Sequence, residues 1–390
     1  MNRDKRVEYI REIEKLRTSN LLVYFTGDRQ GMMSWIAEDA VLPLYRHLLD
    51  LGPPQACGRR MDLYLYTRGG DVSVPWRVVA MLREFCDELC VLIPYKAYSA
   101  GTMLALGADV TVMGTKAELS PIDPTLMRAS AAESTVPPPQ ISVEDVSSYI
   151  SFMRERANIT DQAALARVVS QLASNLTPLT LGSVNRQYSH IRLVARKLLT
   201  SGKEKVDEGK LGSIIEALTE KMYSHGHAIA RKEARELGLQ VEDAPKDVEH
   251  LMWNLYEENE DMLSLAEPLD PEELLAREKG DEVARERVPL AAIESTQRLH
   301  VFELNYVFRR KRQVPSNPQV NINLNLGLPA GIEPAGLPKD LQRILQQLLG
   351  QVQEAVPQIV QQELMRQCPV VGIEGRTFGG KWVDKTEEGA

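Results

Sequence analysis

The stretch IPYKAYSAGTMLALG, residues 93–107, takes a short apolar strand into Ser99 and at once into a helical pattern. Serine is a common helix N-cap, so Ser99 could simply begin a helix. It could also be a nucleophile held at a strand-to-helix turn. The residues around this stretch must decide between the two interpretations.

Acyl transfer by a serine requires a base, a group that orients the base, and N–H donors for the oxyanion. Part of this setting is visible around Ser99. The small residues Ala100 and Gly101 leave room for a substrate carbonyl, and the N–H of Ala100 lies at the N-terminus of the expected helix, where the dipole favours negative charge.

Gly69 and Gly70 in YTRGGD follow the apolar strand MDLYLYT. In a parallel sheet they would lie at the same carboxyl edge as Ser99, where such sheets bind ligands. A glycine pair alone indicates only a turn. Two such features at neighbouring strand ends indicate a site.

The flanking sequence alternates strand and helix patterns, which predicts an α/β fold with a mostly parallel sheet covered by helices. A first helix has Val7, Ile10, Ile13 and Leu16 in one stripe. The predicted strands are LLVYF, MDLYLYT, ELCVLIP and VTVM, and the predicted helices between them cover residues 34–51, a segment opening near Pro75, and a segment from Ser99 to about Ala108.

Composition limits the function classes. The chain has 390 residues, 43% of them hydrophobic, which is enough for a sizeable core, and its net charge of −8 argues against a nucleic-acid or anionic-membrane partner. No apolar run reaches the about 18 to 20 residues of a membrane span, and the charged N-terminus does not resemble a signal peptide. We therefore expect a cytoplasmic protein.

Cysteine and histidine spacing indicates no disulfide framework and no metal. Cys57, Cys86, Cys90 and Cys368 are interpreted as reduced and structural. The HGH motif at residues 225–227 lacks further ligands at a suitable spacing.

The C-terminal part differs in character. Residues 246–315 are rich in charge and predict a helical extension, and residues 316–390 form an arm. In that arm VNINLNLGL alternates as an edge strand would, and a glutamine-rich amphipathic helix follows. Its stripe of Ile344, Leu348, Val352 and Val356 predicts a packing surface for a partner or another subunit.

Three ordered motifs, LYLYTRGGDVSVPW, VLIPYKAYSAGTMLALGADVTVMGTKAELSPIDP and SHGHAIARKEARELGL, resemble the serine dehydrogenase proteinase family over residues 21–241. That family is related to Clp protease and signal peptide peptidase A. The resemblance implies a Clp/crotonase-like fold of repeated β-β-α/β-α units, a peptide or protein substrate, a homo-oligomer and no cofactor. The expected organisation is an N-terminal amphipathic helix (1–20), a Clp/crotonase-like serine peptidase domain (21–245), a charged helical extension (246–315) and a C-terminal arm with an amphipathic helix (316–390).

The resemblance also implies roles for individual residues. Ser99 matches the nucleophile, Asp123 the orienting acid and His225 the base. The oxyanion-hole positions match Gly69, Gly70 and Ala100. His227, two residues from His225, and Lys116 stay open as alternative bases.

Two other functions remain open at this stage. One is a catalytically silent Clp-fold scaffold whose C-terminal extension binds a partner. The other is a crotonase-type acyl-CoA enzyme, which uses paired N–H donors of the same fold without a serine nucleophile. Survival or loss of activity on Ser99→Ala separates them from the peptidase.

Overall fold

The computed structural model describes residues 3–52, 59–122, 125–126, 141–175, 178–203, 206–221, 226–278, 280–313 and 338–387. The chain divides into two compact units. Unit 1 comprises Met1–Pro268, Val288–Leu304 and Gly380–Ala390, and unit 2 comprises Leu269–Arg287 and Asn305–Gly379.

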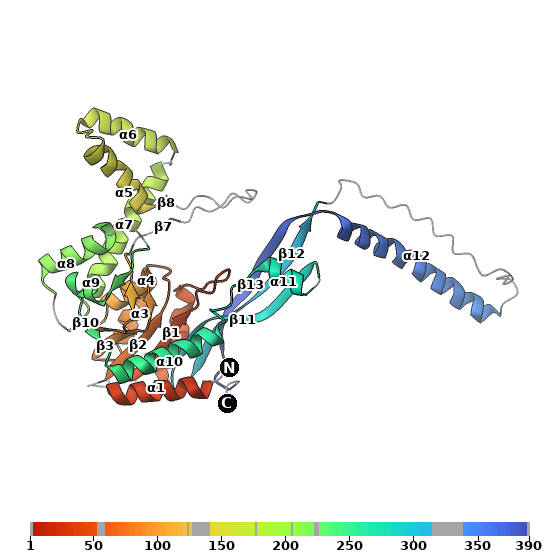
Figure 1. Cartoon of the computed structure of the whole chain (residues 1–390), viewed down its shortest axis with the longest axis horizontal. Coiled ribbons are helices and arrows are strands. Elements are labelled where there is room, and N and C mark those ends of the chain that lie inside the picture. Colours follow the sequence, from red (N-terminus) through yellow and green to blue (C-terminus); the bar gives the residue numbers. More distant parts are fainter. Residues whose placement is uncertain are drawn as a thin grey trace. The chain divides into compact units, whose positions relative to one another are not determined.

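A sheet of mostly parallel strands forms the centre of unit 1, as the sequence predicted (Figure 1). Its parallel neighbours lie in the order β10-β5-β3-β2-β1, and β11 continues the sheet antiparallel to β1. The strands are β1 (Asn20–Thr26), β2 (Arg60–Tyr66), β3 (Glu88–Ile93), β5 (Val110–Met113), β10 (Val241–Asp243), β11 (Glu282–Glu294), β12 (Leu299–Arg312) and β13 (Val370–Asp384).

Helices alternate with these strands. Those of unit 1 are α1 (Arg3–Arg17), α2 (Val41–Asp50), α3 (Val74–Arg83), α4 (Ala100–Leu106), α5 (Val143–Ser151), α6 (Gln162–Asn175), α7 (Pro178–Leu199), α8 (Glu208–Glu216), α9 (Arg231–Glu236) and α10 (Lys246–Met262). Short strands make two smaller sheets: β4 (Lys96–Ala97), β6 (Glu118–Leu119) and β9 (Ile229–Ala230) form one, and β7 (Thr125–Leu126) and β8 (Ile141–Ser142) form the other.

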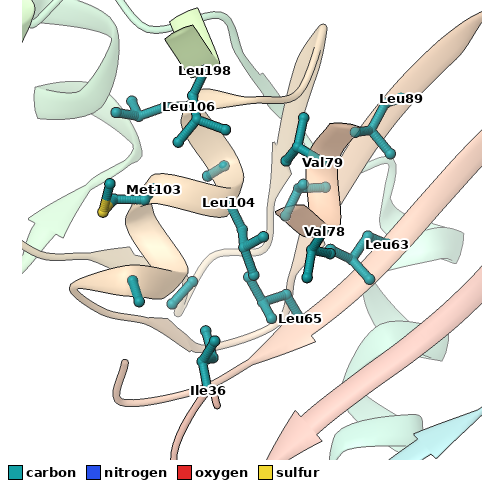
Figure 2. Close-up of a cluster of buried hydrophobic side chains, with 14 of the residues drawn as sticks. Ile36, Leu63, Leu65, Val78, Val79, Leu89, Met103, Leu104, Leu106 and Leu198 are labelled. Atoms are coloured by element: carbon teal, nitrogen blue, oxygen red, sulfur yellow. The ribbon is translucent and has the colours of Figure 1, made fainter. Parts of the chain in front are cut away.

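Both faces of the central sheet are buried, which explains why its strands are continuously apolar. Successive side chains of a strand point to opposite faces. Leu63 and Leu65 of β2 belong to the core with α2, α3, α4, α7 and α8, whereas Tyr64 and Tyr66 belong to the core with α1 and α10. Figure 2 shows the first core, where Leu104 of α4 lies close to Leu65.

The N-terminal helix α1 packs beside α10 through the predicted apolar stripe. Ile10 and Ile13 are fully buried, but Leu16, predicted to share the stripe, is 50% exposed in the last turn. A buried ion pair joins Arg6 to Glu294 of β11, with Nε donating to Oε2 at 2.6 Å. The pair therefore fixes α1 to the antiparallel strand.

The prediction of a charged helical extension over residues 246–315 is only partly right. This stretch contains α10 and α11 (Pro271–Arg277), but also the long strands β11 and β12. Tyr306 and Phe308 alternate with more exposed residues along β12. Glu282, Arg285 and Arg287 occupy exposed positions of β11, whereas Glu294 of the same strand is buried.

The arm over residues 316–390 contains the expected helix as α12 (Lys339–Gln367), followed by the strand β13, which the sequence analysis did not predict. The edge strand predicted at residues 320–328 lies outside the described residues. Among the helices that the structure describes, none is long and apolar enough to cross a membrane. Cys86, Cys90 and Cys368 are free.

α4 packs against the end of β2 with almost no space between them. An ideal Cβ built on Gly101 would lie 2.4 Å from Cγ2 of Thr67, closer than real Cβ contacts. Glycine at position 101 is therefore required by the distance between the two backbones. By contrast, a Cβ on Gly182 of α7 would meet nothing within 4 Å.

We expect Gly101→Ala to lower the free energy of unfolding by about 1–3 kcal/mol, because the added methyl overpacks the contact with Thr67. Gly182→Ala is the matched control. It should raise stability by about 0.5–1 kcal/mol, since alanine is favoured in a helix interior. Thermal or urea unfolding measures both, and equal effects of the two substitutions would contradict the packing argument.

Two buried histidines connect α2 to β12. Nδ1 of His47 lies 2.9 Å from Oγ of Ser295, and its Nε2 lies 3.1 Å from Nδ1 of His300. Burial, the neighbouring His300 and the Arg298 guanidinium lower the pKa of His47 to about 3, although Asp50 acts in the opposite direction. Burial also lowers the pKa of His300.

Stability should consequently fall as pH drops below about 6.5, because the unfolded histidines bind protons that the folded ones exclude. Each histidine contributes at most about 1.4 kcal/mol per pH unit over this range. Urea unfolding between about pH 7.5 and about pH 5.5 measures the slope. We expect His47→Gln to lower stability at the higher pH but to flatten the slope; an unchanged slope would contradict this.

Candidate active site

Ser99 lies where the short strand β4 gives way to α4, in a backbone conformation that serine rarely adopts. Its φ is 51° and its ψ is −110°. Such conformations cost on the order of 1–3 kcal/mol and concentrate at functional sites. Although Ser99 occupies the N-cap position of α4, its side chain makes no capping hydrogen bond. The simple N-cap interpretation does not describe this serine.

Ser120 and Thr102 hold the Ser99 turn in place. The N–H of Ser99 donates to Oγ of Ser120 at 2.8 Å. Oγ1 of Thr102 donates to the carbonyls of Ala97 and Ser120 and accepts from the N–H of Ser120 at 3.0 Å. All of these groups are buried, so hydrogen bonds here are not weakened by competition from water.

The glycine pair lies directly against this turn. Gly69 has φ +111°, and a Cβ there would lie 2.7 Å from Cβ of Ser99 and 3.3 Å from its Oγ. Gly70 has φ +151°, and a Cβ there would lie 2.1 Å from the carbonyl oxygen of Ile36. A side chain would overlap Ser99 at position 69 and Ile36 at position 70, so both positions require glycine.

Hydrogen bonding distinguishes the two glycines. The N–H of Gly69 donates to Oγ1 of Thr67 at 3.0 Å, and its carbonyl accepts from the N–H of Ile36 at 2.8 Å. Within the described residues, the N–H groups of Gly70 and Ala100 have no acceptor, and neither does the hydroxyl of Ser99. Two backbone donors near Ser99 are thus left for a ligand.

The small sheet β4-β6-β9 brings the segments at Ser99, at Ser120 and at residues 226–228 to one end. β4 runs parallel to β6, so the chain leaves both strands at the same end, toward Ser99 from β4 and toward Ser120 from β6. β9 runs antiparallel to β6, with Leu119 opposite Ile229, so residues 226–228 enter β9 at that same end. Ser120 already contacts the backbone of Ser99 there.

Asp123 and His225 lie outside the described residues. The described chain reaches Ile122, two residues beyond Ser120, and resumes at Gly226. Ile122 is buried and its N–H donates to the carbonyl of Leu218 at 2.9 Å. The described neighbour of Asp123 is therefore part of the packed domain.

His227, the first alternative base, contacts a different group. Its Nε2 lies 2.7 Å from Oε1 of Glu233 in α9, and its side chain is 40% exposed. This contact leaves only Nδ1 of His227 available for another partner.

Lys116, the second alternative base, precedes β6 at the end opposite to Ser120. Its Nζ donates to Oε1 of Glu118 at 2.8 Å and lies 4.8 Å from the ring centroid of Tyr95. The hydrogen bond to Glu118 raises the pKa of Lys116 above its ordinary value. A lysine base requires the opposite shift, which argues against Lys116.

A polar cluster flanks the glycine pair. Asp28 accepts from Nζ of Lys96 at 2.8 Å and from the hydroxyl of Tyr66 at 2.7 Å, and Arg68 approaches it to 3.7 Å. The hydroxyl of Tyr98, the residue before Ser99, donates to Oε2 of Glu118. Burial and this hydrogen bond raise the pKa of Tyr98, so it stays protonated at neutral pH.

Sequence reasoning missed Ser120, Thr102 and Thr67, the three hydroxyls that hold the site. Ser120 stands in the quoted SPIDP motif, three residues before Asp123, but only the aspartate has an obvious chemical role in the sequence. Thr67 ends the strand before the glycine pair. Their roles depend on contacts between segments that are distant in sequence.

Comparison with known proteins finds a matching family model and several relatives. Residues 2–148 match the model of the ClpP-like SDH-type serine proteinases. Two uncharacterized proteins of Methanocaldococcus jannaschii are similar: one is 29% identical over 193 residues, 49% of this chain and 57% of the relative, and the other is 22% identical over 260 residues, 64% of this chain and 75% of the relative. The chain thus spans little more than half the length of the first.

Two solved structures are also similar. One is a serine-to-alanine mutant of the 1510-N membrane-bound stomatin-specific protease, and the other is a lysine-to-alanine mutant of it in complex with a substrate peptide. Both are 15% identical with a TM-score of 0.33, and each match covers 58% of this chain and 80% or 76%, respectively, of the other. The family match over residues 2–148 agrees with the resemblance inferred from the motifs: this part of the chain is similar to the ClpP-like SDH-type serine proteinases.

Proposed function

We propose that the chain is a serine peptidase that hydrolyses peptide bonds through an acyl-enzyme on Ser99. The observation that supports the proposal is the small sheet β4-β6-β9, whose register directs Ser99, Ser120 and residues 226–228 to one end. Asp123 and His225 are close neighbours of these residues in the sequence. The family match over residues 2–148 supports the same chemistry.

In the proposed mechanism Oγ of Ser99 attacks the scissile carbonyl carbon. His225 takes the hydroxyl proton and later returns it to the leaving amine, while Asp123 holds the imidazole in the required tautomer. Water then hydrolyses the ester and releases Ser99. Both partner residues are taken from the motif match, and no cofactor enters these steps.

The oxyanion donors in this mechanism are the N–H groups of Gly70 and Ala100. Both are without an acceptor among the described residues, whereas the N–H of Gly69 is already bonded to Thr67. Among the candidate glycines, this supports Gly70 as the donor and gives Gly69 a spacing role beside Ser99. Preorganised donors of this kind lower the barrier because they need not reorient during the reaction.

His225 is the proposed base because it matches the motif position of the family's base, whereas Lys116 lies at the wrong end of β6 and His227 is two residues away. Glu233 binds Nε2 of His227, and Glu118 binds Lys116 at the wrong end of β6. The proposal also includes a Clp/crotonase-like layout of repeated units, a homo-oligomer and a cytoplasmic location, which follow from the family resemblance and from composition.

A fluorophosphonate probe, which reacts with activated serines, tests the proposal. We expect the folded protein to be labelled and Ser99→Ala to reduce labelling by about 10³-fold or more, since the attacking oxygen is gone. Circular dichroism checks that the variant is folded. Absence of labelling of the folded parent would favour the scaffold, and acyl-CoA turnover that survives Ser99→Ala would favour the crotonase-type enzyme.

The identity of the base needs separate variants. We expect His225→Ala to reduce the labelling rate by about 10³-fold or more, because no other group removes the Ser99 proton. His227→Ala should leave the rate within roughly threefold of the parent, because it loses only the contact with Glu233. If only His227→Ala reduced the labelling rate, His227 would be the base. If neither variant reduced the rate, neither histidine would be the base and a lysine base would be favoured.

A further inference from the structure

Helix α12 of unit 2 is long and exposes a set of large apolar side chains. Its 29 residues correspond to a length of about 44 Å. Figure 1 shows no described helix or strand of this unit packed along it. Leu364 (45%) is exposed on another face of the helix. The exposed residues of one face are Leu341 (50%), Ile344 (53%), Leu348 (54%), Val352 (38%) and Ile359 (61%).

These residues, together with the partly buried Val356, occupy one face of the helix, which we call the α12 stripe. Their spacings of three, four and seven residues match the repeat of neighbours along a helix. The opposite face carries polar residues such as Arg343 and Gln346. An apolar stripe of this length is stable in water only if another surface covers it.

The α12 stripe is symmetric about Gly350. Leu348 and Val352 lie two residues either side of it, Ile344 and Val356 six, and Leu341 and Ile359 nine. An antiparallel copy of the helix centred at Gly350 would therefore place each stripe residue opposite another stripe residue. Each layer would combine a leucine or isoleucine with an isoleucine or valine, so no layer pairs two small or two polar residues.

Charge permits the same arrangement. α12 has three basic residues and three acidic residues, so two copies do not repel each other.

We propose that the α12 stripe is a homotypic interface, in which α12 of one chain pairs antiparallel with α12 of a second copy about Gly350. The occupant is a second copy because the stripe is complementary to itself in both shape and charge. This interface is independent of the proposed chemistry at Ser99. It would join two chains whether or not they are peptidases.

Cysteine crosslinking in the full-length chain tests the proposal, in a background with Cys57 and Cys368 replaced by serine. Leu348→Cys and Val352→Cys proteins are mixed and oxidised. Antiparallel pairing brings Cβ of position 348 near that of position 352 on the partner, whereas identical positions are offset by about 6 Å along the axis. We expect the mixed disulfide to exceed the same-residue products by roughly fivefold.

The matched control uses Arg343→Cys and Gln346→Cys, which lie on the opposite face and should yield roughly tenfold less product. Adding Ile344→Glu to the first pair should reduce its product roughly tenfold, since the charge would be buried in the interface. Adding Arg343→Glu, on the exposed face, should not. Preferential same-residue products would overturn antiparallel pairing, and crosslinking no stronger than the control would overturn the interface itself.

Discussion

The close approach of the backbone at residues 67–70 to the Ser99 turn is the contact on which the candidate site depends. Side chains at positions 69 and 101 would overlap Ser99 and Thr67, so glycine at both positions lets the two segments come together. The approach also stabilises the uncommon conformation of Ser99, because hydrogen bonds surround the strained residue.

Buried hydroxyl groups carry out much of this positioning. Ser120 binds the N–H of Ser99, Thr102 binds Ser120 in turn, and Thr67 occupies the N–H of Gly69. Each is neutral at all accessible pH values, so the turn is held without charges that would compete with a developing oxyanion. Lys116 is paired with Glu118 at the other end of β6.

The two units differ in how much of their apolar surface is buried. Unit 1 buries both faces of a parallel sheet, and its strands are therefore apolar throughout. In unit 2 the strands β11 and β12 carry exposed charges, and α12 exposes a full apolar stripe. A surface of that kind in a chain with a net charge of −8 is best satisfied by a neutral, apolar partner surface, which its own second copy provides.

By itself, the sequence determined the α/β class, the parallel strands of unit 1 and the importance of the Ser99 stretch. Periodicity and glycine positions are visible within short stretches of sequence, so they predict these elements without knowledge of distant contacts. It could not separate charged strands from a charged helix in β11 and β12, since both patterns put charge on an exposed face.

Only the tertiary structure decided which groups surround Ser99. The occupied N–H of Gly69, the contact of Ser120 with Ser99 and the pairing of Lys116 with Glu118 all join residues that come together through strand register. Hydrogen bonds between distant segments leave no periodic trace in a sequence. The sequence therefore identifies Ser99 as a candidate nucleophile, whereas the fold determines which groups form hydrogen bonds around it.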